Sequence, residues 1–272
     1  MMQMAKQQAK QYIPSLTREE FLKEKKQNKQ YFSIVKKSNA LIQKARYTFS
    51  LQQQKILCFL ITHLAENDTH ETEKKFDIKT FYDFMEVDSK NYERVRENLK
   101  ALRDKSWFIT SEDGTETSVS FLTKISTNKR NGTATVFFDR DILPYLQELK
   151  TKYTTYKLYY IMTMKSQYSI RLYELFKSVA GKTNWYFSVE ELRKLFMCEK
   201  NYSLMADFKK RVIEPAIKEI NEKTDITVDF TYVSEGRKIL GIDCHVEYKN
   251  IQDRLVVDKQ IRAELDGQTC FD

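Results

Sequence analysis

The sequence has few cysteines, and none of them are paired. The 4 cysteines, Cys58, Cys198, Cys244 and Cys270, stand far apart with no C-x-x-C pair. This spacing argues against both a metal cluster and a disulfide framework. Three of them lie within apolar patterns, where a thiol packs as a small hydrophobic side chain. We therefore expect free thiols in a reducing compartment, which predicts a cytoplasmic protein.

The catalytic patterns of DNA enzymes are missing as well. The 3 histidines, His63, His70 and His245, form no H-x-H or H-E-x-x-H pair, so a metal-dependent nuclease would lack its ligands. No G-x-x-x-x-G-K-[ST] loop is present to bind ATP. The paired histidines of a rolling-circle nicking enzyme and the His-x-x-Arg of a tyrosine recombinase do not occur either. The sequence predicts no catalytic residue, no metal and no cofactor.

Long apolar runs are also absent. No stretch approaches the roughly 18 apolar residues of a membrane span. The first residues lack the apolar core of a signal peptide. We expect a soluble protein with no membrane partner.

Positive charge and aromatic residues, by contrast, are abundant. Among 272 residues, 46 Lys and Arg stand against 38 Asp and Glu, for a formal net charge of +8. Such an excess suggests an anionic partner, most commonly nucleic acid, although many basic proteins bind none. Hydrophobic residues make up 41% of the chain, with 17 Phe and 16 Tyr. The length and composition therefore allow two domains of ordinary size, each with a core.

Two parts of the chain resemble each other. FDIKTFYDFMEVDSKNY at 76–92 aligns with FSVEELRKLFMCEKNY at 187–202 after one deletion. An amphipathic helix is expected before each segment, over 50–66 and 166–180, with Ser50 and Ser166 as N-caps. A longer helix is expected after each segment, over 89–105 and 202–223.

An alternating hairpin pattern follows each long helix, at 106–138 and 225–248. Turns are marked at Gly114, Gly132 and Gly236. Helix, short helix, turn, long helix and two-stranded ribbon is the order of a winged helix-turn-helix. The sequence thus predicts an α+β, helix-rich fold with two tandem winged helix-turn-helix domains and β-hairpin wings.

The predicted organisation has four parts. A flexible basic arm at 1–30 precedes a first winged-helix domain at 31–150 and a second at 151–250, and a tail occupies 251–272. The arm is rich in Gln and Lys and is either solvated or in contact with phosphates. The tail is expected because it carries few large apolar residues.

The expected helix over 202–223 carries the strongest DNA-binding signal. At 100° per residue, a buried stripe is formed by Leu204, Met205, Phe208, Val212 and Ala216. Polar and basic residues gather on the other side, and Pro215 should remove a hydrogen bond and bend the axis. Any surface helix carries charge opposite its core, so this helix alone does not decide the function. The repeated outline and the charged wings favour DNA.

A helix-turn-helix protein presents the first turns of its second helix to base edges in the major groove. In the second half, the candidate DNA-binding residues are Lys200, Asn201, Ser203, Asp207, Lys209, Lys210, Arg211, Arg237 and Lys238. Lys209 lies nearer the buried side and is expected to reach a phosphate.

The first half repeats this design with less positive charge. Its candidate DNA-binding residues are Lys90 and Arg94 on the helix and Lys129 and Arg130 at the wing tip. Val95, Leu99 and Leu102 are expected on the buried side of the same helix, with Tyr92. Outward acids, Glu93 and Glu97, dilute the basic face, so weaker binding is expected here. A further phosphate contact is predicted where the 166–180 helix begins, from Ser166, Tyr168 and Arg171.

Several stretches resemble the iteron-binding, theta-type plasmid replication initiators (Rep proteins). They are KKSNALIQKARYTFSLQQQKIL (36–57), FFDRDILPYLQELK (137–150), SQYSIRLYELFK (166–177), FSVEELRKLF (187–196) and FKKRVIEPAIKEINEKTDI (208–226). The resemblance covers roughly 31–248 and implies two winged-helix domains. In that family, the first usually mediates dimerisation and the second dominates base reading, which places the recognition role on Ser203, Lys210 and Arg211.

The resemblance also implies the partners. They are double-stranded DNA at origin iterons, an inverted repeat at which a dimer represses its own gene, a second copy of the chain, and host replication proteins. Melting of AT-rich DNA is the expected outcome. Two rival functions stay open from the sequence: a winged-helix transcription regulator that never initiates replication, and a nicking enzyme.

Overall fold

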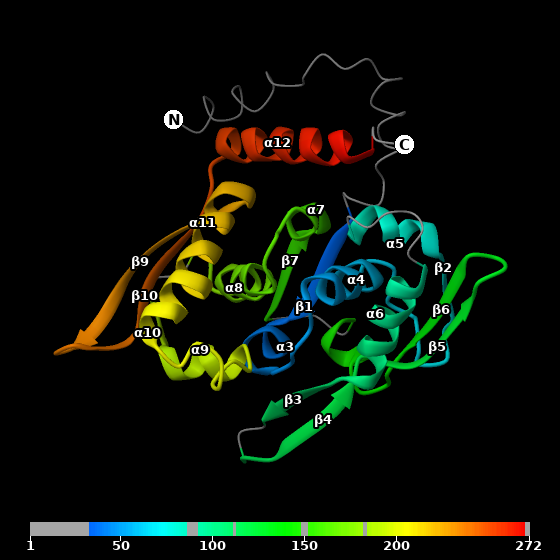
Figure 1. Cartoon of the computed structure of the whole chain (residues 1–272), viewed down its shortest axis with the longest axis horizontal. Helices are drawn as coiled ribbons and strands as arrows, with labels where there is room; N and C mark the ends of the chain where they lie inside the picture. The colour runs from blue at the N-terminus through cyan, green and yellow to red at the C-terminus, as the bar shows by residue number, and fades with distance from the viewer. Residues whose placement is uncertain (1–32, 86–91, 111–112, 148–151, 182–183, 270–272) are drawn as a thin grey trace, which may run out of the picture.

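The computed structural model describes residues 33–85, 92–110, 113–147, 152–181 and 184–269. The predicted N-terminal arm, Lys90 and Cys270 lie outside these residues. Within them, the chain forms two winged helices. Helix α4 of the first and helix α8 of the second contact each other at the centre of the molecule (Figure 1). The predicted fold class is confirmed.

The first winged helix begins with a strand and a short helix and ends in two hairpins. Its elements are β1 (Ile34–Ser38), α3 (Asn39–Lys44), α4 (Leu51–Ile61), β2 (Lys74–Asp77), α5 (Ile78–Met85), α6 (Tyr92–Asp104), β3 (Ser106–Thr110), β4 (Glu116–Ser120), β5 (Leu122–Asn128) and β6 (Thr133–Phe138). Strand β2 joins the β5–β6 hairpin in the order β2-β6-β5, while β3 and β4 pair only with each other. The segment 106–138, expected as one hairpin, therefore folds as two.

A connector leads to the second winged helix. It contains η1 (Leu143–Tyr145), β7 (Tyr153–Lys157) and α7 (Leu158–Met162). The second winged helix follows with α8 (Gln167–Lys177), β8 (Trp185–Ser188), α9 (Val189–Leu195), α10 (Met205–Phe208), η2 (Lys209–Ile213), α11 (Glu214–Lys223), β9 (Ile226–Glu235) and β10 (Lys238–Tyr248). Its sheet has the order β8-β10-β9. Strand β7 pairs antiparallel with β1, so the predicted division at 150 falls ahead of a strand that returns to the first winged helix.

Local sequence signals account for where these elements begin and turn. The Ser50 side chain accepts a hydrogen bond from the Gln53 amide at the start of α4, and Ser166 caps α8 in the same way. The turn glycines Gly114, Gly132 and Gly236 all have positive φ, a conformation that side-chain-bearing residues adopt only under strain. The predicted N-caps and turn positions are confirmed.

The two winged helices share one continuous apolar core. A buried ionic contact lies within it, between β1 and α8. Lys37 Nζ lies 2.6 Å from Glu174 Oε1, and both side chains are almost fully buried. The Tyr156 hydroxyl, on β7, donates to the same carboxylate oxygen. This network ties the first strand of the chain and the connector to the first helix of the second winged helix.

The C-terminal segment differs from the prediction. Instead of a tail, it forms the helix α12 (Ile251–Thr269), which lies across the top of the molecule above α11 and α7 (Figure 1). Its buried stripe consists of Val257, Ile261 and Leu265. Spacing by four residues places these side chains on one helical face, and that short stripe is enough to dock the helix.

Polar contacts fasten α12 to both the connector and the second winged helix. The Asp258 carboxylate accepts hydrogen bonds from Lys157 Nζ at 3.0 Å, Tyr159 OH at 2.6 Å and Tyr160 OH at 3.0 Å. Glu264 Oε1 lies 3.3 Å from Nζ of Lys223 on α11. Helix α12 is therefore a strap between the connector and the second winged helix. No helix among the described residues is long and apolar enough to cross a bilayer.

Candidate nucleic-acid interface

The helix-turn-helix of the second winged helix is built from α9, a turn and the α10–η2–α11 rod. Ser188 and Glu191 form a capping box at the start of α9. The turn contains two side-chain-bearing residues with positive φ, Met197 at 50° and Tyr202 at 55°. Such strain persists only where the surroundings hold it, and here the Tyr202 ring packs against Tyr168 of α8.

The rod itself changes pitch near Pro215. Residues Lys209–Ile213 form a π-helical turn, after which Pro215 occupies the first turn of α11. Proline has no N–H to donate back along the helix, so the wider turn is where the regular hydrogen bonding is interrupted. The prediction that Pro215 disrupts the helix is confirmed in this form. The basic segment 209–211 lies in the wide turn.

One residue of the expected buried stripe lies elsewhere. Phe208, Val212 and Ala216 are buried, as predicted. Leu204, however, is 66% exposed and serves as the N-cap of α10 instead of a helical residue. The helix begins at Met205, three residues later than the predicted start at 202, and the extended backbone at Leu204 turns its side chain outward.

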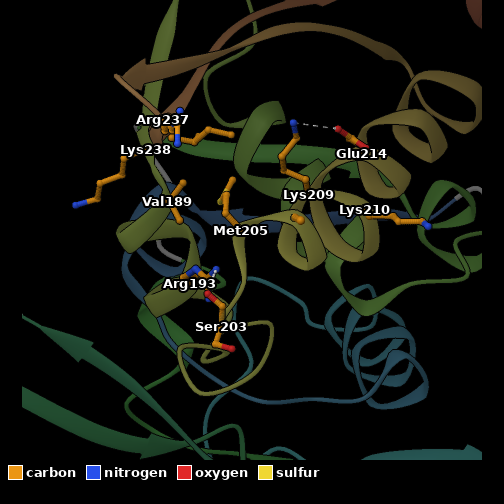
Figure 2. Close-up of a pocket in the computed structure, with 11 residues that line it drawn as sticks. Val189, Arg193, Ser203, Met205, Lys209, Lys210, Glu214, Arg237 and Lys238 are labelled. Atoms are coloured by element: carbon orange, nitrogen blue, oxygen red, sulfur yellow. Dashed lines mark hydrogen bonds and ion pairs between the residues drawn. The ribbon is translucent and has the colours of Figure 1, made fainter.

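A basic cleft separates this rod from the wing. It has a volume of about 820 Å³ and is lined by residues of α9, the turn, the rod and the β9–β10 wing (Figure 2). Its cationic side chains are Arg193, Lys209, Lys210, Arg237 and Lys238, against one acid, Glu214. Figure 2 shows Lys238 and Lys210 extending to opposite sides. We name this feature the basic cleft.

Two cations near the cleft are held by neighbouring acids. Lys209 Nζ lies 4.0 Å from Glu214 Oε1 and 4.1 Å from the centre of the Tyr232 ring. Burial raises the pKa of Tyr232, so its hydroxyl stays protonated and donates to Glu214 at 3.2 Å. Arg211 Nε lies 3.3 Å from Asp207 Oδ1. These contacts orient the Lys209 and Arg211 side chains. The neighbouring carboxylates also neutralise part of their positive charge.

Arg193 on α9 is a functional candidate that sequence reasoning missed. Its guanidinium lies 4.6 Å from the centre of the Phe208 ring. It also donates to the carbonyl oxygens of Asn201 at 3.4 Å and Ser203 at 3.5 Å. Arg193 thus holds the turn against the rod while it lines the basic cleft. The signal available in the sequence was its place near the end of the helix that precedes the turn.

The remaining predicted residues of the second half lie on the turn and at the wing tip. Lys200 and Asn201 are exposed on the turn, and Ser203 lines the basic cleft. Arg237 and Lys238 are exposed at the wing tip. The structure therefore brings five of the predicted residues together in the cleft: Ser203, Lys209, Lys210, Arg237 and Lys238.

The corresponding helix of the first winged helix, α6, carries the cations Arg94, Arg96, Lys100 and Arg103 together with the acids Glu93, Glu97 and Asp104. Val95, Leu99 and Leu102 are buried, as predicted, and Arg94 is exposed. Arg96 Nη1 lies 2.8 Å from Glu93 Oε2.

The first wing also carries its predicted cations at the tip. Lys129 and Arg130 are exposed in the β5–β6 turn. The Asn128 side chain there accepts hydrogen bonds from the Arg130 and Asn131 amides at 2.9 and 3.2 Å. The side chain of Asn128 thus fixes the turn that carries both cations.

The predicted phosphate contact at the start of α8 needs correction. Arg171 is buried, and its guanidinium donates to Tyr47 OH at 2.7 Å and to the Ala45 carbonyl at 2.8 Å. The Ser166 hydroxyl accepts from the Tyr168 amide as the cap of α8. A guanidinium enclosed by the first winged helix cannot reach a phosphate in this arrangement, so Arg171 packs the two winged helices together.

Among the described residues, no three His, Cys, Asp or Glu side chains are placed to hold a metal ion. Burial raises the pKa of Cys198 to about 11 and also raises the pKa of Cys58. Both thiols are therefore protonated at neutral pH and unreactive.

Comparisons with known proteins agree with this geometry. The family model described as "Initiator Replication protein, WH1" matches residues 34–177, and the model "Initiator Rep protein, WH2" matches residues 188–246. Together they cover well over half of the chain. Helix α12 lies beyond both matches.

Several Escherichia coli proteins are similar in sequence. An uncharacterized 27.6 kDa protein is 24% identical over 224 residues, which is 76% of this chain and 93% of that protein. "PI protein" is 33% identical over 150 residues, which is 48% of this chain and 49% of that protein. "Replication initiation protein" is 33% identical over 89 residues, 31% of this chain and 28% of that protein. The last two matches thus span half or less of those relatives.

A solved structure has a similar fold. The crystal structure of Pi initiator protein in complex with iteron DNA aligns with a TM-score of 0.66 at 21% identity. The alignment covers 81% of this chain and 99% of that one. At this level of identity, the likeness concerns the fold.

Proposed function

This chain belongs to the family of initiator replication proteins that carry the winged-helix domains WH1 and WH2, and from that premise we propose that it initiates plasmid replication by binding directly repeated DNA sites, or iterons. The Pi initiator protein, whose fold is similar, was crystallised with iteron DNA. We propose that this chain also binds iteron DNA, and that it does so through its two winged helices.

The basic cleft is the observation that carries the proposal. Duplex DNA presents a negative backbone beside a groove wide enough for one helix. A rod with Lys209 and Lys210 on one side of the cleft and a wing with Arg237 and Lys238 on the other matches that pattern, and Arg211 is exposed on the same rod. We assign base reading to the rod and backbone contacts to the wing and to Lys209.

The first winged helix is proposed to make an auxiliary contact through Arg94, Lys129 and Arg130. Dimerisation through this half, repression of the protein's own gene at an inverted repeat, and recruitment of host replication proteins follow from the family resemblance and stay predictions. Location in the cytoplasm is proposed on the same basis.

A footprint across the DNA that flanks the gene tests the central proposal. We expect protection of direct repeats of about 20 base pairs each, close to two helical turns. A scrambled duplex of equal length and composition is the control. Binding to the repeats should fall by about 10³ or more between 50 and 200 mM salt if six or more phosphates are neutralised. Equal affinity for repeats and scrambled DNA would defeat the proposal.

A transcription regulator with the same fold is the second candidate, because it would use the same cleft. Plasmid maintenance separates the two functions. A plasmid carrying the repeats and the adjacent AT-rich DNA should replicate only in cells that supply this chain. Repression of a reporter without plasmid maintenance would support the regulator instead.

We further propose that the chain acts without cutting DNA. The support is the lack of a metal-ligand cluster in the described residues and the high pKa of the buried thiols. Supercoiled origin DNA incubated with the protein and Mg²⁺ should stay supercoiled. Relaxation, or a covalent protein–DNA adduct, would show that a nicking activity is present.

A further inference from the structure

Leu204 is a large apolar side chain in a place that usually holds a small polar one. It forms the N-cap of α10, makes no capping hydrogen bond and is 66% exposed. Single exposed apolar residues are common on protein surfaces and need no explanation alone. Here, however, the residue stands at the exposed end of the proposed recognition rod, where the chain gains nothing in stability from leucine.

Other helices of the same chain show what a stabilising choice looks like. Serine is the N-cap of α3, α4, α8 and α9, and in each case its side chain accepts a backbone hydrogen bond. The backbone of Leu204 has φ −74° and ψ 132°, the extended geometry in which serine would do the same. A residue that breaks a local rule without a structural gain points to a functional demand.

Leu204 adjoins the basic cleft without lining it. The φ of 55° at Tyr202 turns the chain just before Ser203, which lines the basic cleft. Asp207, three residues after Leu204, lies on the same helical face. It contacts Arg211 at 3.3 Å and so extends this face along the rod. Leu204 thus leads a line of exposed side chains that ends in an oriented guanidinium.

The major groove offers such a side chain one apolar partner. Among the base edges there, only thymine carries a methyl group, at C5, while the other groups donate or accept hydrogen bonds. We infer that Leu204 reads the 5-methyl group of a thymine in the bound DNA site. This inference rests on the proposed function and specifies one feature of the sequence that the second winged helix prefers.

The test uses DNA from which single methyl groups are removed. The full chain first selects its preferred duplex from a random library. Each thymine of that duplex is then replaced in turn by deoxyuridine, which pairs identically but lacks the 5-methyl group. We expect one or two positions at which the wild-type affinity falls about 3- to 10-fold, the range expected when one buried methyl contact is lost.

Three variants connect that loss to Leu204. Leu204→Ala should bind the thymine duplex more weakly and show no further loss with deoxyuridine at the same positions. Leu204→Ser should do likewise, yet keep or raise the melting temperature because serine can cap α10. Val256→Ala, at another exposed aliphatic residue on α12, is the matched control and should discriminate as the wild type does.

The outcomes are separable. Equal wild-type affinity for all thymine and deoxyuridine duplexes would overturn the inference. Discrimination that persists in Leu204→Ala and Leu204→Ser would overturn it as well. If those variants instead lose self-association while DNA binding is unchanged, Leu204 contacts a protein, and the inference is wrong. Failure of the library to yield any preferred duplex would count against the proposed function itself.

Discussion

The two winged helices share a core order of elements but present different surfaces to solvent. The rod of the second, α10–η2–α11, borders a cleft lined by five cationic side chains and one acid. The matching helix of the first, α6, exposes Arg94, Lys100 and Arg103 together with the acids Glu93, Glu97 and Asp104. Because the buried stripes of both helices are apolar, the fold survives while the exposed face varies. The proposed function accordingly assigns base reading to the second half and an auxiliary contact to the first.

The hairpins of the two winged helices also differ. The second winged helix has a single long ribbon, β9–β10, whose tip carries Arg237 and Lys238. The first has an additional hairpin, β3–β4, that pairs with no other named strand in the described chain. One half thus keeps a simple wing beside its rod, while the other carries an extra hairpin.

The largest expected effect concerns the contact that joins the halves. Lys37→Met leaves the Glu174 carboxylate buried without its ammonium partner, and we expect a loss of about 3–5 kcal/mol in the free energy of unfolding. Burial works against the charged form of Lys37, but the ion pair and hydrogen bond with Glu174 outweigh it, so the pKa of Lys37 is raised above its usual value and the wild-type ammonium stays charged. Urea unfolding measures the change.

The two tryptophans make this test specific to each half. Trp107 lies in the first winged helix and Trp185 in the second. Variants that retain one of them report each half separately, and coincident transitions are expected in the wild type. Lys36→Met, on the same strand, is the control and should change stability by no more than about 0.5 kcal/mol. A similarly small effect of Lys37→Met would show that the halves are joined by apolar packing alone.

The next effect compares the two recognition faces directly. Removing Lys210 and Arg211 together should cost about 1–3 kcal/mol of binding free energy for each base-reading contact that is lost. Removing Arg94 and Arg96 together should cost less than about 1 kcal/mol, because Arg96 is already paired with Glu93. Fluorescence anisotropy on an iteron duplex gives both values, with thermal melting as the folding control. Equal losses would remove the proposed division of labour.

A smaller effect is expected when acidic residues are removed from the exposed face of α6. Glu93→Gln with Glu97→Gln removes two negative charges from the exposed face, which should raise DNA affinity roughly 2- to 5-fold at low salt. The gain should fade as salt rises, because screening weakens the repulsion that was removed. Glu66→Gln, on the loop after α4, is the matched control. An unchanged affinity would place α6 away from the duplex.

The smallest effect is a pH dependence confined to the first half. Burial lowers the pKa of His63 below its usual 6.5, although the Phe59 carbonyl partly offsets this. Below pH 6.5 the unfolded chain therefore binds more protons than the folded one, so stability falls as the pH decreases. After allowance for solvent screening, this contribution stays below about 1 kcal/mol. His63→Phe should flatten the stability profile between pH 7 and 5.5, which urea unfolding at a series of pH values measures.

Much of the fold could be predicted because local signals and global packing agree. Ser50 and Ser166 cap helices whose apolar faces repeat every three to four residues, and glycines mark the wing turns. The two-domain architecture could then be predicted because the same order of helices and hairpin occurs twice in the sequence. Five of the predicted DNA-binding residues of the second half line one cleft because turn, rod and wing adjoin in any winged helix.

The predictions that were wrong concern residues whose structure is decided by contacts with distant parts of the chain. Helix α12 was expected as a tail because its apolar stripe is short, and the Asp258 contacts that anchor it come from residues about a hundred positions earlier. Arg171 looked like an anion-binding residue at a helix start, yet Tyr47 encloses it. Leu204 fitted the apolar pattern because periodicity does not show where a helix begins.

The position of α12 in the chain has a consequence for synthesis. A ribosome makes both winged helices before it makes the helix that straps the second of them to the connector. Until Asp258 emerges, the side chains of Lys157, Tyr159 and Tyr160 meet water instead of a carboxylate. The nascent protein can therefore fold its two halves in turn, and the contacts of α12 with the connector and the second half form only after translation has passed both.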